Sequence, residues 1–377
     1  MIRIDEIYNN TFWPFIDQHI PKTRLFFCDP FGHSDVDHLF SRSHSDPLHY
    51  ILLHDQEPIH LDIHTKLFNE VKNRTLDIRG SHERLENYYP RGTRRDAIIT
   101  SERNSDAVNY ICNVYGWKSY YYFFHGWAAL DWYRGYDKTF LMTPPQDRVI
   151  TKSFINPNRI IGGKRQHRVL LMYHLLKMGI KDAWISFPET CPAEKTHISE
   201  IVKEFKHQYP NMIDVFNQAN LPLNFPGEEN HPMHSCWLSL FDEAAESLAY
   251  VVTETVFEGH RHHLTEKTFK PICLGMPFVL ASTAGSLSYL RDYGFKTFDS
   301  IWDESYDLEP DDYWRMYKIA ELLKSLDDMS NEQRQNLFER AIPIIEHNYN
   351  HFYGGGFEQI LWAELNSMLN ELTADLA

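Results

Sequence analysis

The sequence lacks the features that mark membrane, secreted and zinc-ribbon proteins. No apolar run approaches the length that spans a bilayer, and the first residues lack the apolar stretch of a signal peptide. The five cysteines are scattered without a short CxxC spacing, which argues against a zinc ribbon, a redox pair or a disulfide framework. We therefore expect a cytoplasmic protein without a membrane span, whose cysteines are buried free thiols.

Basic charge is also scarce. The formal net charge of -15 removes any general attraction to nucleic acid or to an acidic membrane surface. Two local basic clusters remain, one at 84–95, which includes Tyr88 and Tyr89, and one at 159–168. A solvated loop face is the simpler interpretation of the first cluster. The second precedes a predicted helix and is the better candidate for an anion site.

The chain of 377 residues is long enough for two domains, and its hydrophobic content of 43% can form their cores. Its first half repeats short β-branched or aromatic runs that end in polar turns, a pattern typical of strands buried in a parallel sheet. These predicted strands lie at 24–28, 50–53, 97–100 and 120–124. With a helix predicted at 104–115, they indicate an α/β domain whose loops after the strands converge at one edge.

A turn-rich stretch at 143–163 marks the predicted domain boundary, because it contains Pro144-Pro145 and Gly162-Gly163. A second α/β series follows it. Its predicted strands lie at 183–187, 249–253 and 278–281, and its predicted helices at 166–178, 196–209, 266–274 and 287–293.

From Asp311 onward the chain is predicted to be helical, with a capping box at Ser330 and Gln333 and a kink at Pro343. We expect two Rossmann-like α/β domains that face each other across a cleft, with helices at the C-terminus. One α/β domain is predicted at 1–150, a second at 151–330, and helices that pack back toward the N-terminal domain at 331–377. This layout alone also suits dehydrogenases and sugar-binding proteins.

The segment 249–298 carries the residues suited to chemistry. A buried strand brings Glu254 to its carboxyl end, and after a loop Thr265 caps a helix whose first turn contains Glu266 and Lys267. The amino terminus of a helix binds anions, and the lysine adds a mobile positive charge that can follow a diphosphate. Glu266 is suited to accept hydrogen bonds from ribose hydroxyls. A second helix start at Ser286 offers another such end, although ordinary capping also explains each motif.

The order of these elements resembles the donor-binding motif of the α1,3-fucosyltransferases, which have the GT-B fold of two Rossmann-like domains. In that motif an acidic strand end is followed by Thr-Glu-Lys, an apolar helix and Ala-Gly-x-x-Pro-Val-Val. The matching elements here are Glu254, Thr265-Glu266-Lys267 and Leu274-Gly275-Met276-Pro277. The resemblance is confined to the second domain. Two residues depart from it: Pro271 stands inside the helix, and Thr255 follows the acidic residue where the family has Asn-Ser.

The resemblance implies that Glu266 binds the ribose and Lys267 the diphosphate, while Glu254 lies close to the donor sugar or the helix start. An arginine from the start of the second domain completes the phosphate clamp. Candidates for that clamp are Arg165 and Arg168, in a run that also contains Lys164. The resemblance favours a GDP-linked sugar as the donor, with a UDP-linked sugar as the alternative, and an inverting reaction. The absence of a DxD-type carboxylate pair beside the motif agrees with a metal-independent site.

Loops of the first domain are expected to supply the acceptor site and the catalytic base. The run 54–58 follows directly after a predicted strand, and Glu57 is our first choice for the base, with Asp55 second. Capping of the next element is the alternative role for both carboxylates. The neighbouring loop ends are expected to shape the acceptor pocket; these are Asp29 with His33, Ser101-Glu102, and His125.

The histidines at 259–263 suggest a metal site at first sight. Adjacent histidines in one loop point in different directions, and no carboxylate or cysteine spacing completes a tetrahedral set, so we predict no metal here. Arg261 or a histidine of this loop is expected beside the donor phosphates instead.

The sequence therefore predicts a glycosyltransferase that moves a sugar from a nucleotide-diphosphate sugar to a hydroxyl of a glycan acceptor. One alternative is a glycosyltransferase that modifies hydroxylated bases of DNA and uses the basic cluster at 84–95. Another is a non-catalytic module that binds a sugar nucleotide or a glycan.

Overall fold

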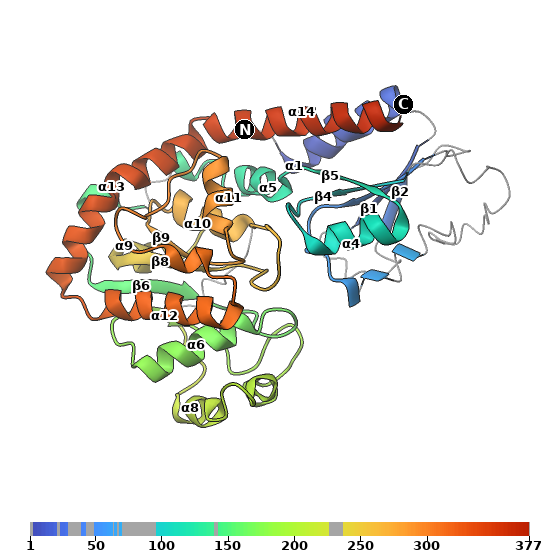
Figure 1. Ribbon diagram of the computed structural model, residues 1–377. Coiled ribbons are helices and arrows are strands. Elements are labelled where there is room, and N and C mark those ends of the chain that lie inside the picture. Colours follow the sequence, from blue (N-terminus) through green and yellow to red (C-terminus); the bar gives the residue numbers. More distant parts are fainter. Residues whose placement is uncertain are drawn as a thin grey trace. The chain divides into compact units, whose positions relative to one another are not determined.

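The computed structural model describes residues 3–20, 23–28, 39–42, 49–62, 64–65, 68–69, 96–138, 142–225 and 237–376 (Figure 1). The chain divides into two compact units. Unit 1 consists of Met1–Asp131, His260–His263 and Glu358–Ala377, and unit 2 of Trp132–Gly259 and Leu264–Phe357. The basic cluster at 84–95 and the predicted loop ends Asp29 and His33 lie outside the described residues. No helix within the described ranges is long and apolar enough to cross a membrane.

Among its described residues, unit 1 contains a five-stranded sheet with the order β2-β1-β3-β4-β5. Its strands are β1 (Thr23–Cys28), β2 (Leu39–Arg42), β3 (His49–His54), β4 (Ala97–Thr100) and β5 (Lys118–Tyr121). β2 is antiparallel to β1, and the other neighbours are parallel. The strands predicted at 24–28, 50–53 and 97–100 are confirmed. The strand predicted at 120–124 is confirmed only in part, because β5 ends at Tyr121 and α5 (Phe124–Trp132) begins at the last residue of the predicted strand. Since α5 is buried on all sides, its sequence has no helical periodicity that would distinguish it from a strand.

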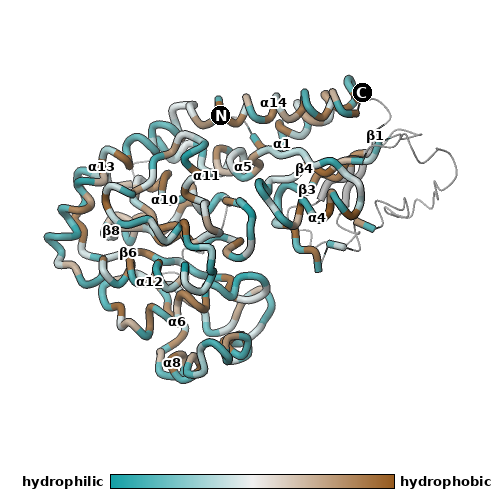
Figure 2. The backbone as a smooth tube through the Cα atoms, in the orientation of Figure 1, coloured by the Kyte–Doolittle hydropathy of each residue, from teal (hydrophilic) through white to brown (hydrophobic). Residues whose placement is uncertain are grey.

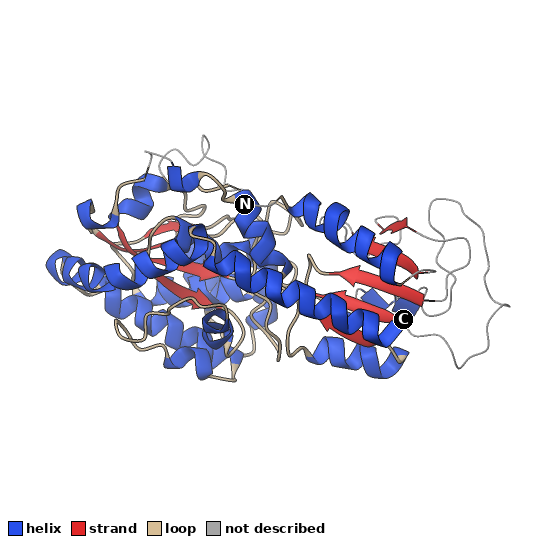
Figure 3. Cartoon of the chain, turned by 90° about the horizontal axis from the view of Figure 1, so that it is seen from above, coloured by secondary structure: helices blue, strands red, loops and turns tan. Residues whose placement is uncertain are grey.

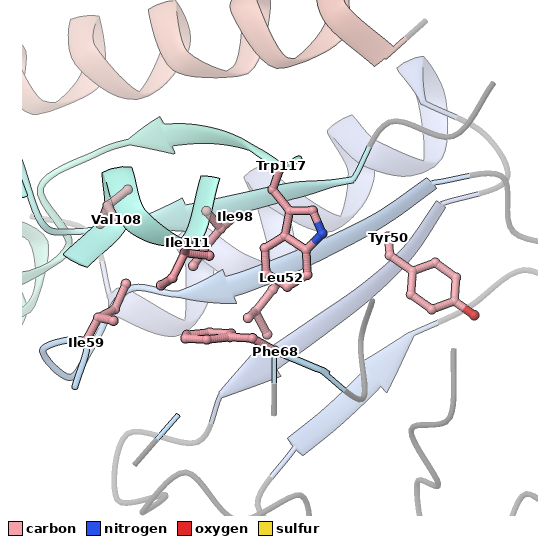
Figure 4. Packing of buried hydrophobic residues seen from close by; sticks show 8 residues of the cluster. All are labelled: Tyr50, Leu52, Ile59, Phe68, Ile98, Val108, Ile111 and Trp117. Carbon is pink, nitrogen blue, oxygen red and sulfur yellow. The ribbon is translucent and has the colours of Figure 1, made fainter. Parts of the chain in front are cut away.

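The helices of unit 1 begin with one continuous N-terminal segment of α1 (Ile4–Glu6), the π-helical η1 (Ile7–Phe12) and α2 (Trp13–His19). The helix predicted at 104–115 is confirmed as α4 (Asp106–Tyr115), which Ser105 caps by accepting a hydrogen bond from the Val108 amide. α4 packs its buried side against β3 and β4. Figure 4 shows this core, formed by Tyr50, Leu52, Ile59, Phe68, Ile98, Val108, Ile111 and Trp117.

The last helix, α14 (Gly356–Leu376), places all but its first two residues in unit 1. Hydrophobic and hydrophilic positions alternate along it (Figure 2), and it lies over the sheet of unit 1 (Figure 3). Its Trp362 ring contacts the Trp127 ring at 4.7 Å, and the Glu364 carboxylate accepts a hydrogen bond of 2.7 Å from the Phe123 amide. Burial of the apolar side of α14 holds this helix against β5 and α5.

Unit 2 contains a four-stranded parallel sheet with the order β7-β6-β8-β9 among its described residues. Its strands are β6 (Lys152–Pro157), β7 (Trp184–Ser186), β8 (Ser247–Thr253) and β9 (Phe278–Ala281). Every residue of β8 and β9 is buried, as expected for central strands covered on both faces. The predictions at 183–187, 249–253 and 278–281 are confirmed.

Unit 2 contains the predicted helices with one exception, together with two short helices that were not predicted, at 212–218 and 241–246. They are α6 (His167–Met178), α7 (Ile198–Ile201), η5 (Val202–Phe205), α8 (Met212–Gln218), α9 (Phe241–Glu246), α10 (Glu266–Cys273), α11 (Ser286–Asp292), α12 (Asp312–Asp327) and α13 (Asn331–Tyr353). The exception is the helix predicted at 196–209, which tightens into the 3-10 turn η5 where it packs against α8. The capping box at Ser330 is confirmed, and α13 continues through Pro343. The fold is mixed α/β with parallel sheets and a helical C-terminus, compatible with a Rossmann-like fold.

Candidate functional site

Glu254 lies at the carboxyl end of β8 and holds the start of α10. Its fully buried carboxylate accepts four hydrogen bonds: at Oε1 from the Thr265 amide (3.0 Å) and the Thr268 hydroxyl (2.6 Å), and at Oε2 from the Thr265 hydroxyl (2.6 Å) and the Thr255 amide (3.1 Å). A carboxylate has about four acceptor positions, and all are used here. The carboxylate therefore positions the loop and the helix start, and the structure leaves it no lone pair for a reacting group.

The sequence-predicted turn of Thr265, Glu266 and Lys267 forms a compact group, which we call the α10 turn. The Lys267 ammonium donates to the Glu266 carboxylate at 2.9 Å and to the Thr265 hydroxyl at 3.2 Å, and it also reaches the Thr255 hydroxyl at 3.3 Å. The Lys267 side chain is 28% exposed and the Glu266 side chain 5%. A cation at the first turn of a helix is thus accessible to a ligand, beside amides that attract anions.

The start of α6 brings Arg168 and His167 to the same sheet edge. The buried Arg168 guanidinium donates to the carbonyls of Ile160 (2.8 Å) and Thr253 (2.9 Å). His167 Nε2 lies 3.0 Å from the Glu254 carbonyl, and burial holds the pKa of His167 well below its ordinary value. The neutral imidazole therefore carries its proton on Nε2 and donates it to that carbonyl. Both side chains brace the end of β8.

Arg165 differs from Arg168 in its bonding. Its half-buried guanidinium makes no hydrogen bond or ion pair with the part of the chain that the structure describes. Burial, and after it the Arg165 charge, lower the pKa of Arg168 to about 9, while Glu254 and Glu266 oppose the change. The charges of Arg165, Glu254 and Glu266 therefore all affect the protonation of the Arg168 guanidinium. Lys164, by contrast, is exposed.

Arg315 of α12 connects the loops that follow β8 and β9. Its buried guanidinium donates to the carbonyl of Ser282 at 3.0 Å and to that of Phe257 at 2.5 Å, and it lies over the Phe257 ring at 4.4 Å. An ion pair of 2.5 Å with Asp312 offsets its charge. The sequence prediction missed this residue. The available signal was an arginine on the apolar side of a helix, next to Met316.

Ser286, predicted as a second anion-binding helix start, is enclosed by its own loop. Its hydroxyl donates to the Thr283 carbonyl at 2.7 Å, and Asp307 accepts a hydrogen bond from the Leu287 amide at 3.1 Å. Burial raises the pKa of Asp307 to about 6. The chain thus caps α11 with its own acidic group, and α11 spans only seven residues.

In unit 1, Asp55 lies at the carboxyl end of β3 in a pocket of tyrosines. Its Oδ2 accepts hydrogen bonds from the Tyr8 hydroxyl (3.1 Å) and from the Tyr122 hydroxyl, while Oδ1 has no hydrogen-bond partner among the described residues. Burial raises the pKa of Asp55 to about 7. Tyr8 belongs to the π-helical η1, and such turns are rare and frequent at functional sites. Glu57, two residues later, is exposed.

Histidines surround the same loop. The His54 and His64 Nε2 atoms lie 3.4 Å apart, and the His60 amide donates to His64 Nδ1 at 2.9 Å. Burial lowers the pKa of His54 to about 3 and that of His64 to about 4, so both rings are neutral near pH 7. His64 then carries its proton on Nε2 and donates it to His54. These rings hold the loop after β3.

The loop at His260–His263 belongs to unit 1 and joins the turn after β4. The Arg261 guanidinium donates to the buried Glu102 carboxylate at 3.2 Å and to the Ile59 carbonyl at 2.8 Å. The His263 ring contacts the His125 ring at 5.0 Å. The structure thus groups Arg261 with Glu102 in unit 1, and a place for Arg261 beside the donor phosphates stays a prediction. No group of histidine, cysteine and carboxylate side chains that could hold a metal occurs within the described ranges.

Comparison of the chain with protein-family models, with curated proteins and with solved structures finds no match. A function for this chain therefore rests on its residues and their geometry.

Proposed function

We propose that the chain is a glycosyltransferase that moves a sugar from a nucleotide-diphosphate sugar to a hydroxyl of a glycan acceptor. The observation that carries the proposal is the α10 turn. There an accessible ammonium sits at the first turn of a helix whose start Glu254 holds from within. A preorganised cation beside helix amides suits a diphosphate, whose charge grows as the glycosidic bond breaks.

In this proposal the two units are the halves of a GT-B enzyme, and unit 2 binds the donor. Lys267 leaves the Glu266 carboxylate for the diphosphate, which frees Glu266 to accept hydrogen bonds from the ribose hydroxyls. We assign Arg165 as the second cation of the clamp, because the Arg168 guanidinium is already bonded to backbone carbonyls. Two cations and a helix start neutralise the leaving diphosphate without a metal. GDP-linked donors are favoured by the resemblance to fucosyltransferases, with UDP-linked donors as the alternative.

The chemical step we propose is a single displacement with inversion. A base removes the proton of the acceptor hydroxyl, the oxygen attacks the anomeric carbon, and the bond to the diphosphate breaks. Glu57 remains our choice for the base, because its carboxylate is exposed to solvent. Asp55 is fully buried and its raised pKa keeps much of it protonated near neutral pH, which suits a structural role better.

Nucleotide binding is the first test. At a concentration a hundredfold above its dissociation constant, the preferred nucleotide should add about 2.7 kcal/mol to the free energy of unfolding. Thermal unfolding is measured with GDP, UDP, CMP and ADP, and GDP is expected to give the largest shift. If none of the four raises the melting temperature, the proposal fails. Donor binding without release of diphosphate in the presence of any glycan acceptor would instead indicate a binding module.

Lys267→Ala tests the clamp. Loss of a charge-assisted contact of about 1.5 to 3 kcal/mol should weaken nucleotide-diphosphate binding by roughly 10- to 150-fold. Lys270→Ala, on the same helix one turn later, is the matched control and should bind like the wild type. Calorimetry with the diphosphate and with the free nucleoside separates the two contributions, since only the diphosphate should lose affinity. Wild-type binding by Lys267→Ala would remove this residue from the site.

A further inference from the structure

An aromatic surface on α12 of unit 2 is not used by the proposed reaction. Trp314 is 52% exposed and Tyr313 39%, and Tyr317 and Tyr209 are half-buried beside them. The Trp314 and Tyr317 rings lie parallel within 8° at 5.1 Å, and the Tyr209 ring lies 6.1 Å from that of Tyr313. Single exposed aromatics need no explanation, but a contiguous group of them marks a binding surface. We call Tyr209, Tyr313, Trp314 and Tyr317 the aromatic platform.

The platform is built on a rigid base. The buried His174 ring of α6 contacts the Tyr209 ring at 5.4 Å and the Tyr317 ring at 5.5 Å, so one ring supports both pairs. Asp311 caps α12 by accepting a hydrogen bond of 2.8 Å from the Trp314 amide. A ligand that binds here orders few side chains, which keeps the entropic cost of binding low.

The surroundings of the platform are acidic. Burial raises the pKa of Tyr313 most, and the negative charges of four carboxylates raise it further: Glu258, Asp312, Asp311 and Glu204. Glu321 likewise raises the pKa of Tyr317. Two neighbouring cations are paired with carboxylates, Lys318 with Glu309 and Arg315 with Asp312. A carboxylate accepts more hydrogen bonds than these pairs use, so acceptors surround the rings.

We propose that the aromatic platform binds a neutral oligosaccharide. The electron-rich faces of tyrosine and tryptophan attract the C–H bonds that line one face of a pyranose ring. The carboxylates and phenols around them accept hydrogen bonds from sugar hydroxyls. The same carboxylates repel anions, which disfavours nucleic acid, an acidic membrane or the phosphates of a nucleotide. The platform goes beyond the proposed transfer reaction, because sugar binding here needs no donor and no chemical step.

Arg315 connects the platform to the loop after β8, which leads to the α10 turn. This residue follows Trp314 directly, and its guanidinium holds the Phe257 carbonyl in the loop after β8. Glu204, which acts on Tyr313, also accepts a hydrogen bond of 3.1 Å from Gln166 beside Arg165. An oligosaccharide on the platform therefore lies at the same sheet edge as the proposed donor site.

The probes are neutral hexasaccharides of α- and β-linked glucose, of mannose and of N-acetylglucosamine. Their binding is measured by tryptophan fluorescence and by retardation in native gels that contain the matching polysaccharide. At least one should bind the wild type, and Trp314→Ala should weaken that binding about tenfold or more. Trp237→Ala, another half-exposed tryptophan of unit 2, should not. Melting temperatures of both variants should stay close to that of the wild type, because both side chains are exposed.

Several outcomes would contradict the proposal that the aromatic platform binds an oligosaccharide. These are failure of every probe to bind, equal binding by Trp314→Ala, and equal losses in Trp314→Ala and Trp237→Ala. If GDP or UDP quenches the tryptophan fluorescence and Trp314→Ala removes this quenching, the rings bind a nucleobase instead. If the protein self-associates and Trp314→Ala abolishes the self-association, the rings bind a second copy of the chain. Lys267→Ala keeps the failures distinct: it should retain oligosaccharide binding even where nucleotide binding is lost.

Discussion

Glu254→Gln is expected to lower the free energy of unfolding of unit 2 by about 3 kcal/mol or more. The glutamine oxygen can replace only one of the two carboxylate oxygens. The amide group then faces two donors, one of which is a backbone N–H of Thr255 or Thr265 that cannot turn away. Loss of the negative charge also leaves the nearby Arg168 guanidinium less well balanced, since Glu254 is one of the charges that favour its protonated form.

The consequence for ligand binding follows from the same contacts. Without the carboxylate, the Thr265 cap is no longer held to the end of β8, and the first turn of α10 loses its fixed position. Nucleotide affinity should therefore fall together with stability. Denaturant unfolding measures the stability, and hydrogen exchange at the Thr255 and Thr265 amides should accelerate locally.

Glu258→Gln is the matched control for this variant. It removes one carboxylate from the same loop, but its side chain is exposed, so stability should change by no more than about 0.5 kcal/mol. A Glu254→Gln protein with wild-type stability and no turnover would contradict the positioning role and make Glu254 a catalytic residue. Loss of both stability and turnover in Glu254→Gln, with wild-type stability and turnover in Glu258→Gln, would support the positioning role.

Periodicity and capping predicted the elements of unit 2 because these signals are local. The buried run of β8 and the Thr265 cap at the first turn of α10 are each recognised from a few consecutive residues. The hydrogen bonds that organise the site are not local. Arg315 reaches the Phe257 carbonyl 58 residues away, and Asp307 caps α11 from 20 residues beyond Leu287. No pattern in one sequence links positions so far apart.

The same limit explains why the sequence did not distinguish Arg165 from Arg168 at the start of α6. The sequence placed two arginines at one helix start and treated them as equivalent candidates. Their difference depends on depth, since Arg168 is 5% exposed and bonded to carbonyls while Arg165 is half-buried. Burial of a charged side chain is a property of the packed sheet, which a charge pattern does not contain.

Asp55→Asn is expected to remove a pH dependence from the stability of unit 1. The pKa of Asp55 is 3.8 ordinarily and about 7 in the folded chain, because burial penalises the ionised form and no cation pairs with it among the described residues. Between these two values the unfolded chain carries a carboxylate and the folded chain a protonated carboxyl. Folding then takes up a proton, so the stabilisation is complete below about pH 4 and is lost as the pH rises to about 7.

The slope in this window is about 1.4 kcal/mol per pH unit, which gives a change of about 3 kcal/mol between pH 5 and pH 8. Denaturant unfolding of the wild type and Asp55→Asn at pH 5, 6, 7 and 8 measures it, because all other titrating groups cancel in the difference. Tyr122→Phe removes a hydrogen bond that lowers the pKa of Asp55, so it should extend the window to higher pH. A difference that stays constant with pH would mean that Asp55 is ionised throughout. It would then be as suitable a base as Glu57, and our assignment of the base would lose its physical ground.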